Sequence, residues 1–245
     1  MKNWKIYIWI LVIYLAMQLG SIPVSRSLFT YFMETGGQPK DLAEMNAIAW
    51  GLFISNLIAA PFILYMTTRN KKFWDIFKRG KKASIGKTIL FGVLGFFMAM
   101  AGQMIAGIIE MAFGVMPGSE NTEMLSKLAK ASAILIIPIV IFAPLLEELV
   151  FRRVIFGGLY TKTNFWIAAL ISAVLFSLVH GEPQHLLIYM APGLVFAFIY
   201  YQTQRIWAPM IAHFLMNSFV MVVQFNYDKL MDLQQMNEAF IFFLR

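Results

Sequence analysis

The chain has 245 residues, of which 60% are hydrophobic and 16% aromatic, while only 13% are charged. A soluble domain carries roughly 25% charged residues, so this composition and a mean hydropathy of +0.69 indicate a protein embedded in a lipid bilayer. Cysteine is absent, which excludes disulfides, thiol catalysis and cysteine-ligated metal centres. We expect one integral-membrane domain over residues 1–245, without an internal repeat or a soluble linker domain.

Seven apolar stretches are long enough to cross a membrane, because a spanning helix needs about 20 predominantly apolar residues. The first follows a short basic start and has no small-residue cleavage site after it, so we expect a retained span rather than a secretory signal. The tail after Asn226 ends in an apolar stretch, 239–244, which we expect to lie at the interface or to dock. The predicted fold is all-α, a polytopic membrane helix bundle of about seven transmembrane helices, with eight possible, over residues 6–24, 47–68, 88–116, 131–160, 165–180, 185–203 and 206–225.

The net charge of +7 comes largely from one loop. Cytoplasmic loops of membrane proteins carry an excess of lysine and arginine, so we expect this loop and the N-terminus to be cytoplasmic in a multi-pass protein of the cell membrane. Membrane lipid is then the expected partner, and nucleic acid is not. Four apolar residues within the loop predict a short interfacial helix on anionic lipid, namely Phe73, Trp74, Ile76 and Phe77. The basic residues, opposed only by Asp75, are Arg69, Lys71, Lys72, Lys78, Arg79, Lys81, Lys82 and Lys87.

Three short motifs place polar side chains one helical turn apart inside these apolar stretches. A charged side chain at the centre of a transmembrane helix costs roughly 2.5 to 3.5 kcal/mol on insertion scales, so such groups face a bundle interior and mark functional sites. Each motif alone is also compatible with a structural pair that joins helices. Their recurrence on successive spans favours a water-using active site within the bilayer. The motifs are Glu147-Glu148-x-x-x-Arg152, Phe176-x-x-x-His180 and His213-x-x-x-Asn217.

The two adjacent glutamates are expected to have different roles. At 100° per residue they cannot point the same way on one helix. Glu148 lies four residues before Arg152, the spacing that favours an ion pair along a helix face. We therefore predict that Glu148 and Arg152 neutralise each other and that Glu147 faces the cavity. A partly desolvated carboxylate there could accept and return a proton near neutral pH.

The remaining motif residues suit hydrolysis of an amide without a covalent nucleophile. An imidazole can orient a water molecule or donate to a developing oxyanion, and a carboxamide offers two donors. With a rise of about 1.5 Å per residue, Glu147 and His180 both lie roughly 21 to 24 Å from the turn at 161–164, so they can meet. His213 and Asn217 lie closer to that side, which requires a tilted or broken helix.

The three motifs, complete and in this order, resemble those of the CAAX protease and bacteriocin-processing family (CPBP, also called Abi). This family comprises intramembrane endopeptidases and includes the type II CAAX prenyl proteases. The likeness covers about 70 residues, within a predicted catalytic core over 131–225. It implies a protease that hydrolyses a peptide bond of a membrane-associated peptide or protein. Arg153 departs from the pattern, which usually has glycine after the motif arginine, and we expect Gly157 and Gly158 to take over the close packing there.

The resemblance also implies roles for individual residues, in a glutamic endopeptidase without a metal cofactor. Glu147 would be the general base that activates water with His180, and His213 and Asn217 would bind the oxyanion. Glu148, Arg152 and Phe176 would support them.

Several alternatives remain open from the residues alone. Glu147, His180 and His213 could instead hold a zinc ion with water as the fourth ligand. Buried glutamate and histidine relays also occur in proton-coupled transporters, although no repeated half is visible here. A proteolytically silent scaffold or bacteriocin-immunity protein on the same fold is a third alternative. Glu182 and His185 are expected in a solvated loop.

Overall fold

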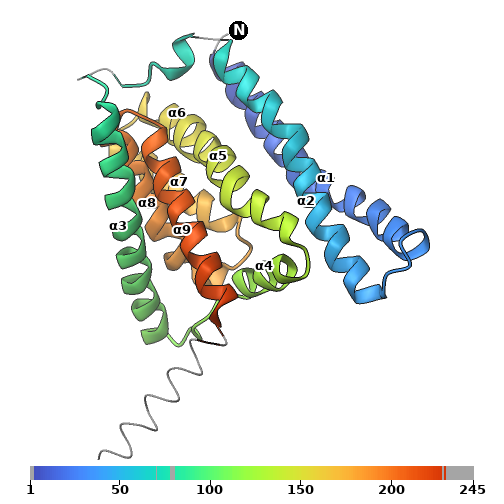
Figure 1. The fold of residues 1–245 in the computed structure, drawn as a ribbon. Coiled ribbons are helices and arrows are strands. Elements are labelled where there is room, and N and C mark those ends of the chain that lie inside the picture. Colours follow the sequence, from blue (N-terminus) through green and yellow to red (C-terminus); the bar gives the residue numbers. More distant parts are fainter. Residues whose placement is uncertain (1–2, 70, 78–80, 228, 230–245) are drawn as a thin grey trace, which may run out of the picture.

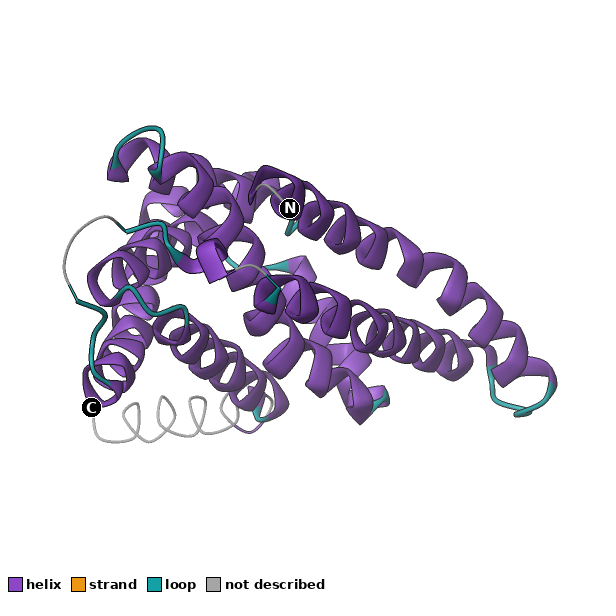
Figure 2. Cartoon of the chain, turned by 90° about the horizontal axis from the view of Figure 1, so that it is seen from above, coloured by secondary structure: helices purple, strands orange, loops and turns teal. Residues whose placement is uncertain are grey.

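The computed structural model describes residues 3–69, 71–77, 81–227 and 229. Within them every regular element is a helix, as Figure 2 shows, and the prediction of an all-α polytopic bundle is confirmed. Six helical stretches in this part of the chain are long and apolar enough to span a membrane. The elements are α1 (Asn3–Glu34), α2 (Lys40–Thr68), η1 (Lys71–Trp74), α3 (Ile85–Ala112), α4 (Glu120–Ala131), η2 (Ala133–Leu135), η3 (Pro138–Phe142), α5 (Ala143–Glu147), η4 (Glu148–Phe156), α6 (Gly157–Tyr160), α7 (Phe165–Leu178), η5 (Pro183–His185), α8 (Leu186–Thr203) and α9 (Trp207–Phe225).

The first two helices form a long antiparallel hairpin beside the remaining helices, and its tip slants away from them (Figure 1). Both helices run beyond the apolar stretches that predict them, α1 with 32 residues and α2 with 29. Their backbones approach closely where Gly51 faces Ser25, since a Cβ atom at position 51 would collide with the serine hydroxyl. Small residues at a helix crossing allow this kind of van der Waals packing inside lipid.

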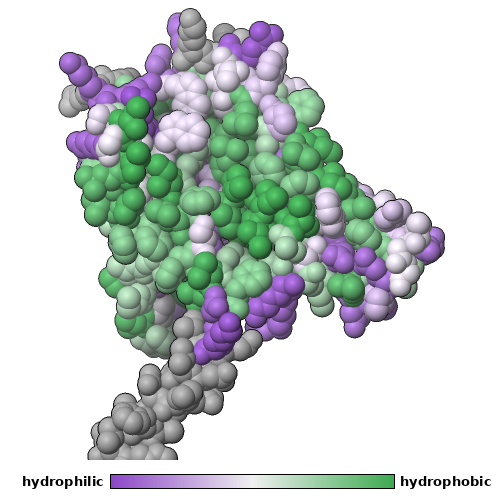
Figure 3. Space-filling model, viewed as in Figure 1, coloured by the Kyte–Doolittle hydropathy of each residue, from purple (hydrophilic) through white to green (hydrophobic). Residues whose placement is uncertain are grey.

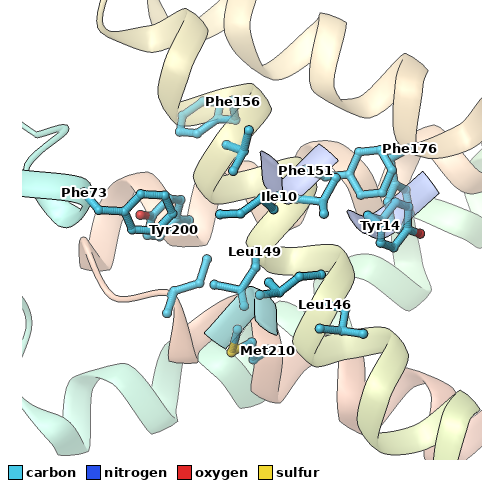
Figure 4. Close-up of a cluster of buried hydrophobic side chains, with 14 of the residues drawn as sticks. Ile10, Tyr14, Phe73, Leu146, Leu149, Phe151, Phe156, Phe176, Tyr200 and Met210 are labelled. Atoms are coloured by element: carbon cyan, nitrogen blue, oxygen red, sulfur yellow. The ribbon is translucent and has the colours of Figure 1, made fainter. Parts of the chain in front are cut away.

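Helices α7, α8 and α9 pack against the stretch 133–160, which runs from η2 to α6, and α3 packs against α8 and α9. Gly92 and Gly95 let α3 approach α8 and α9, because a Cβ at position 92 would lie 2.7 Å from the Ile211 side chain and one at 95 would lie 2.6 Å from that of Ile199. The stretch also contributes to a buried cluster that combines aliphatic and aromatic side chains. Figure 4 shows Tyr14, Phe151 and Phe176 close together in it, with ring centroids of successive pairs 6.1 and 5.2 Å apart.

The fifth predicted span is shorter than expected. Helix α7 has 14 residues, which gives it a length of about 21 Å against a hydrocarbon core of about 30 Å. The chain leaves the helix at Val179, and His180 lies in the turn that follows. His180 is therefore held by bonds to Ser177 O and Phe176 O within the turn and by contacts with other helices, rather than by a continuing helix.

The basic loop packs differently from the prediction. Its regular part is a single 3₁₀ turn, η1, and Phe73 and Ile76 are buried in the core instead of facing lipid. The prediction of an interfacial apolar face is therefore wrong for these two residues. The turns at 161–164 and 204–206 adjoin the loop, since Phe77 contacts the Tyr160 ring at 5.7 Å and Arg205 donates to Ala83 O at 3.0 Å.

Surface hydropathy agrees with a membrane protein. In Figure 3 a broad apolar band lies below the polar surface around the basic loop. Many large apolar side chains are exposed, for example Phe97 and Met104 on α3, as expected where lipid replaces water. The predicted interfacial segment at 239–244 lies outside the described residues.

Candidate active site

The paired glutamates lie where the helix changes its winding. Helix α5 ends at Glu147, and the π-helical segment η4 begins at Glu148. A second π-helical turn, η3, begins at Pro138 and is followed by Pro144. Proline has no N–H and its ring clashes with the preceding turn, which favours a local change of winding. Such π-helical turns recur at functional sites.

The predicted ion pair between Glu148 and Arg152 is present. Arg152 Nε lies 3.1 Å from Glu148 Oε2, and both side chains are fully buried. The guanidinium carbon of Arg152 also lies over the Phe176 ring, 4.3 Å from its centroid, and 5.2 Å from that of Phe196. Cation–π contacts of this kind are stronger when they are desolvated. Phe176 of the second motif therefore covers the charged pair of the first.

His213 joins the two glutamates, a contact that the sequence did not predict. Its Nδ1–H donates to Glu148 Oε1 at 2.9 Å, and its Nε2 lies 3.9 Å from Glu147 Oε2. The imidazole stacks on Phe196, with centroids 5.2 Å apart and planes at 26°. Glu148 thus neutralises Arg152 and also orients His213, so the division of roles between the glutamates is less complete than the helical spacing suggested.

His180 lies near this group but is not paired with Glu147. Among the described residues no ion pair joins the two, whereas Glu147 does approach His213. The His180 Nδ1–H donates to Phe176 O at 2.8 Å. The Phe176 ring lies between the two imidazoles, 5.0 Å from His180 and 5.9 Å from His213. The described residues thus show no direct ion pair between Glu147 and His180, and Phe176 links the His180 and His213 rings instead.

Asn217 is held by the π-helical turn η3. Its amide Nδ2 donates to Ile139 O at 2.8 Å. A carboxamide has two N–H groups, so one remains for another acceptor. The contact ties α9 to η3, on the chain segment that leads to Glu147.

Glu147 opens onto a pocket of about 150 Å³. Its side chain is 15% exposed, whereas that of Glu148 is fully buried. The prediction that Glu147 faces a cavity is confirmed. The N-terminal hairpin forms one wall, where Gln18 Nε2 donates to Tyr14 Oη at 3.2 Å. The lining residues are Tyr14, Met17, Gln18, Leu52, Asn56, Leu125, Leu135, Pro138, Ile139, Ala143, Leu146 and Glu147.

The geometry does not form a three-ligand metal site. Within the described part of the chain, no three His, Asp or Glu side chains are grouped closely enough to hold a metal ion. Of the set Glu147, His180 and His213, an ion pair is seen among the described residues only between Glu147 and His213. The described residues therefore do not fit the zinc alternative in this conformation.

Comparison with known proteins assigns the chain to a family. The model of the type II CAAX prenyl endopeptidase Rce1-like family matches residues 129–219. A protein of Bacillus subtilis (strain 168), named as the membrane peptidase YdiL, is 42% identical over 224 residues, covering 90% of this chain and 89% of that protein. The chain belongs to the Rce1-like family.

Other relatives agree with this assignment. The membrane-embedded CAAX protease MroQ of Staphylococcus aureus (strain USA300) is 38% identical over 143 residues, which is 56% of this chain and 58% of MroQ. No solved structure matches the chain. This Rce1-like protein is an intramembrane endopeptidase, as the resemblance implied, and family membership does not support the transporter alternative.

Arg153, the residue at which this Rce1-like chain departs from the family pattern, is accommodated by the packing around it. Arg153 is fully buried without an acidic partner among the described residues. It donates to Tyr7 Oη at 3.0 Å and lies 4.0 Å from the centroid of Phe73. Gly157 makes room for it, since a Cβ there would lie 2.8 Å from Ile76 and 3.2 Å from Arg153 Nη1. The expected close packing is thus found at Gly157, where it accommodates the arginine.

The prediction of a solvated loop for Glu182 and His185 is wrong. The two residues are only 6% and 4% exposed. His185 Nδ1–H donates to buried Glu110 at 3.0 Å. Burial alone would raise the pKa of Glu182, but hydrogen bonds from Tyr189, Ser119 and the Asn121 backbone N–H outweigh it and hold the pKa below its usual value. Short polar connections look solvated in a sequence, and only the tertiary contacts reveal their burial.

Proposed function

We propose that Glu147 is the general base of this endopeptidase and that it activates water together with His180. The contact that carries the proposal is the 3.9 Å approach of Glu147 Oε2 to His213 Nε2 at the edge of the pocket. A water molecule that donates to Glu147 Oε2 at this edge, about 2.8 Å away, would lie beside the His213 Nε2 that is proposed below to bind the oxyanion. The water proton would pass to Glu147 as the water oxygen attacks the scissile carbonyl carbon.

His213 and Asn217 are the proposed donors to the oxyanion. The Nδ1–H of His213 is already held by Glu148, so the nitrogen that faces Glu147 is Nε2. It is proposed to donate to the oxyanion from a ring that carries both protons throughout the reaction, without transferring either. Asn217 keeps one amide N–H beyond its bond to Ile139. When the tetrahedral intermediate collapses, Glu147 returns its proton to the leaving amine nitrogen, and the C–N bond breaks. Oxyanion donors in a water-poor site make large contributions to catalysis.

The substrate is proposed to be a membrane-associated peptide or protein. To test the reaction, the purified protein in lipid vesicles is incubated with a library of lipid-anchored, quenched-fluorescent peptides. Cleavage by the wild type and not by Glu147→Ala is the expected result, and the peptide so selected serves as the reporter peptide below. Absence of any cleaved product, or cleavage that persists in the variant, would contradict the proposal.

The proposed reaction uses no metal ion. Exhaustive treatment with strong chelators is expected to leave hydrolysis of the reporter peptide unchanged, because a water held by protein groups does not depend on an ion. A zinc metalloprotease treated in parallel is the control and should lose activity. Stoichiometric zinc in the purified protein, with activity recovered only on adding zinc, would replace this proposal with the zinc alternative.

The proposed topology has the N-terminus and the basic loop in the cytoplasm of a cell whose membrane the protein crosses several times. Cysteines introduced at the exposed positions Lys162 and Gln184 test it in this cysteine-free chain. The 161–164 turn adjoins the basic loop, so an impermeant thiol reagent added to intact cells is expected to label position 184 only. Labelling at 162 alone would invert the topology.

A further inference from the structure

A residue outside the three motifs contacts His180 face to face. The ring of Tyr189 on α8 stacks on the imidazole, with centroids 4.0 Å apart and planes at 25°. Phe176 approaches the same imidazole with its ring at 64°, and its carbonyl oxygen accepts the Nδ1–H at 2.8 Å. Two aromatic side chains and one hydrogen bond therefore fix the plane and the rotation of the His180 ring.

Tyr189 is itself anchored through its hydroxyl. The Tyr189 O–H donates to Glu182 Oε2 at 2.7 Å, and the Ser119 hydroxyl donates to the same oxygen at 2.7 Å. The backbone N–H of Asn121 donates to Glu182 Oε1 at 3.1 Å. Glu182 is 6% exposed and Tyr189 is 8% exposed. Hydrogen bonds to a buried carboxylate are among the stronger ones in proteins, so Tyr189 has little freedom to move.

We propose that Tyr189 is a positioning residue for His180 and that Glu182 and Ser119 hold Tyr189 in place. The inference rests on the proposed role of His180 in orienting water. Because the Phe176 carbonyl can only accept, Nδ1 carries the proton and Nε2 of the neutral ring carries the lone pair. The direction of that lone pair follows the plane of the ring, which Tyr189 sets. Displacement of a catalytic group by 1 Å can cost about 10²-fold in rate.

His180 lies just beyond the end of a helix, where the stacking of Tyr189 adds to the local contacts that hold its ring. Helix α7 ends at Leu178, two residues before His180. The backbone N–H of His180 still donates to Ser177 O at 3.1 Å, but the helix does not continue beyond this turn. The support instead comes from the start of α4, where Ser119 is the N-cap and accepts from Thr122 N. The three segments that meet here, 119–121, 182 and 189, are brought together only by the fold.

Three variants separate positioning from general support of the fold. Tyr189→Phe keeps the stacked ring and removes the hydroxyl, Tyr189→Leu removes both, and Glu182→Gln keeps the shape and removes the charge. Tyr201→Leu is the matched control. Tyr201 lies on the same helix, but its ring contacts Phe77, Tyr160 and Phe165, away from His180.

The first measurement needs no substrate. The chain has three histidines, His180, His185 and His213, so NMR of histidine-labelled protein in detergent gives three sets of imidazole signals, and His180→Asn identifies one. Stacking of Tyr189 should displace the His180 ring-proton signals through its ring current. We expect this displacement to persist in Tyr189→Phe and in Tyr201→Leu and to disappear in Tyr189→Leu.

The second measurement is the turnover of the reporter peptide. Tyr189→Leu is expected to lower kcat by about 10²-fold with KM unchanged, Tyr189→Phe to recover most of kcat, and Glu182→Gln to fall between them. Tyr201→Leu should leave kcat unchanged. Unaltered His180 signals in Tyr189→Leu, or an equal loss of kcat in Tyr201→Leu, would overturn the inference. Either result, obtained while Glu147→Gln is inactive, leaves the proposed function intact. Turnover by Glu147→Gln at the wild-type rate would instead refute that function.

Discussion

Replacement of Glu147 by glutamine is expected to lower turnover of the reporter peptide by about 10² to 10⁴-fold, the usual contribution of general acid–base catalysis. Glutamine keeps the size of the side chain but cannot accept a proton from water. Because Glu147 is partly exposed to the pocket and Glu148 carries the buried ion pair, the variant should fold normally. Steady-state cleavage in vesicles gives the rate, and thermal unfolding gives the stability.

The matched control is Glu123→Gln on α4. Glu123 forms an exposed pair with Lys127, with side chains 64% and 68% exposed, so this variant should retain both activity and stability. Full turnover in Glu147→Gln would contradict the assignment of the base. A loss of stability as large as the loss of activity would indicate that Glu147 supports the fold instead.

Replacement of Glu148 by glutamine is expected to lower the free energy of unfolding by about 3 to 5 kcal/mol, the cost of leaving a buried charge without its partner. Arg152 is fully buried beside it, and a neutral amide cannot compensate the guanidinium. Turnover should also fall, since Glu148 orients His213. Denaturant unfolding in detergent measures the stability of the variant.

A double substitution tests whether the uncompensated charge of Arg152 causes this loss of stability. In Glu148→Leu with Arg152→Met the uncompensated charge is gone, and exchange of a buried ion pair for apolar residues of similar volume is often neutral. We therefore expect the double variant to recover most of the stability lost in Glu148→Gln while remaining impaired in turnover. If the double variant is as unstable as Glu148→Gln, packing rather than charge limits the stability of this region.

Short-range patterns in the sequence predicted much of the site. The spacing of Glu148 and Arg152 predicted their ion pair, because residues four apart meet on one helix whatever surrounds it. The motif Phe176-x-x-x-His180 likewise placed both residues on one face. The contact between His213 and Glu148 was not predictable in this way, since 65 residues separate them and their approach depends on how α9 packs beside α5.

The sequence by itself determined that this protein is a helical membrane bundle, that it belongs to an intramembrane protease family, and which side chains form its candidate site. Composition predicts the bundle, and spacing within single helices predicts the candidate side chains, whereas the family follows from the likeness of the three motifs and of related sequences. Only the tertiary structure decided that Glu147 lies beside His213 rather than His180, that the N-terminal hairpin lines the pocket, and that Tyr189 and Glu182 support His180. Those contacts join segments far apart in the chain. Inside a membrane, packing and burial, rather than local spacing, bring them together.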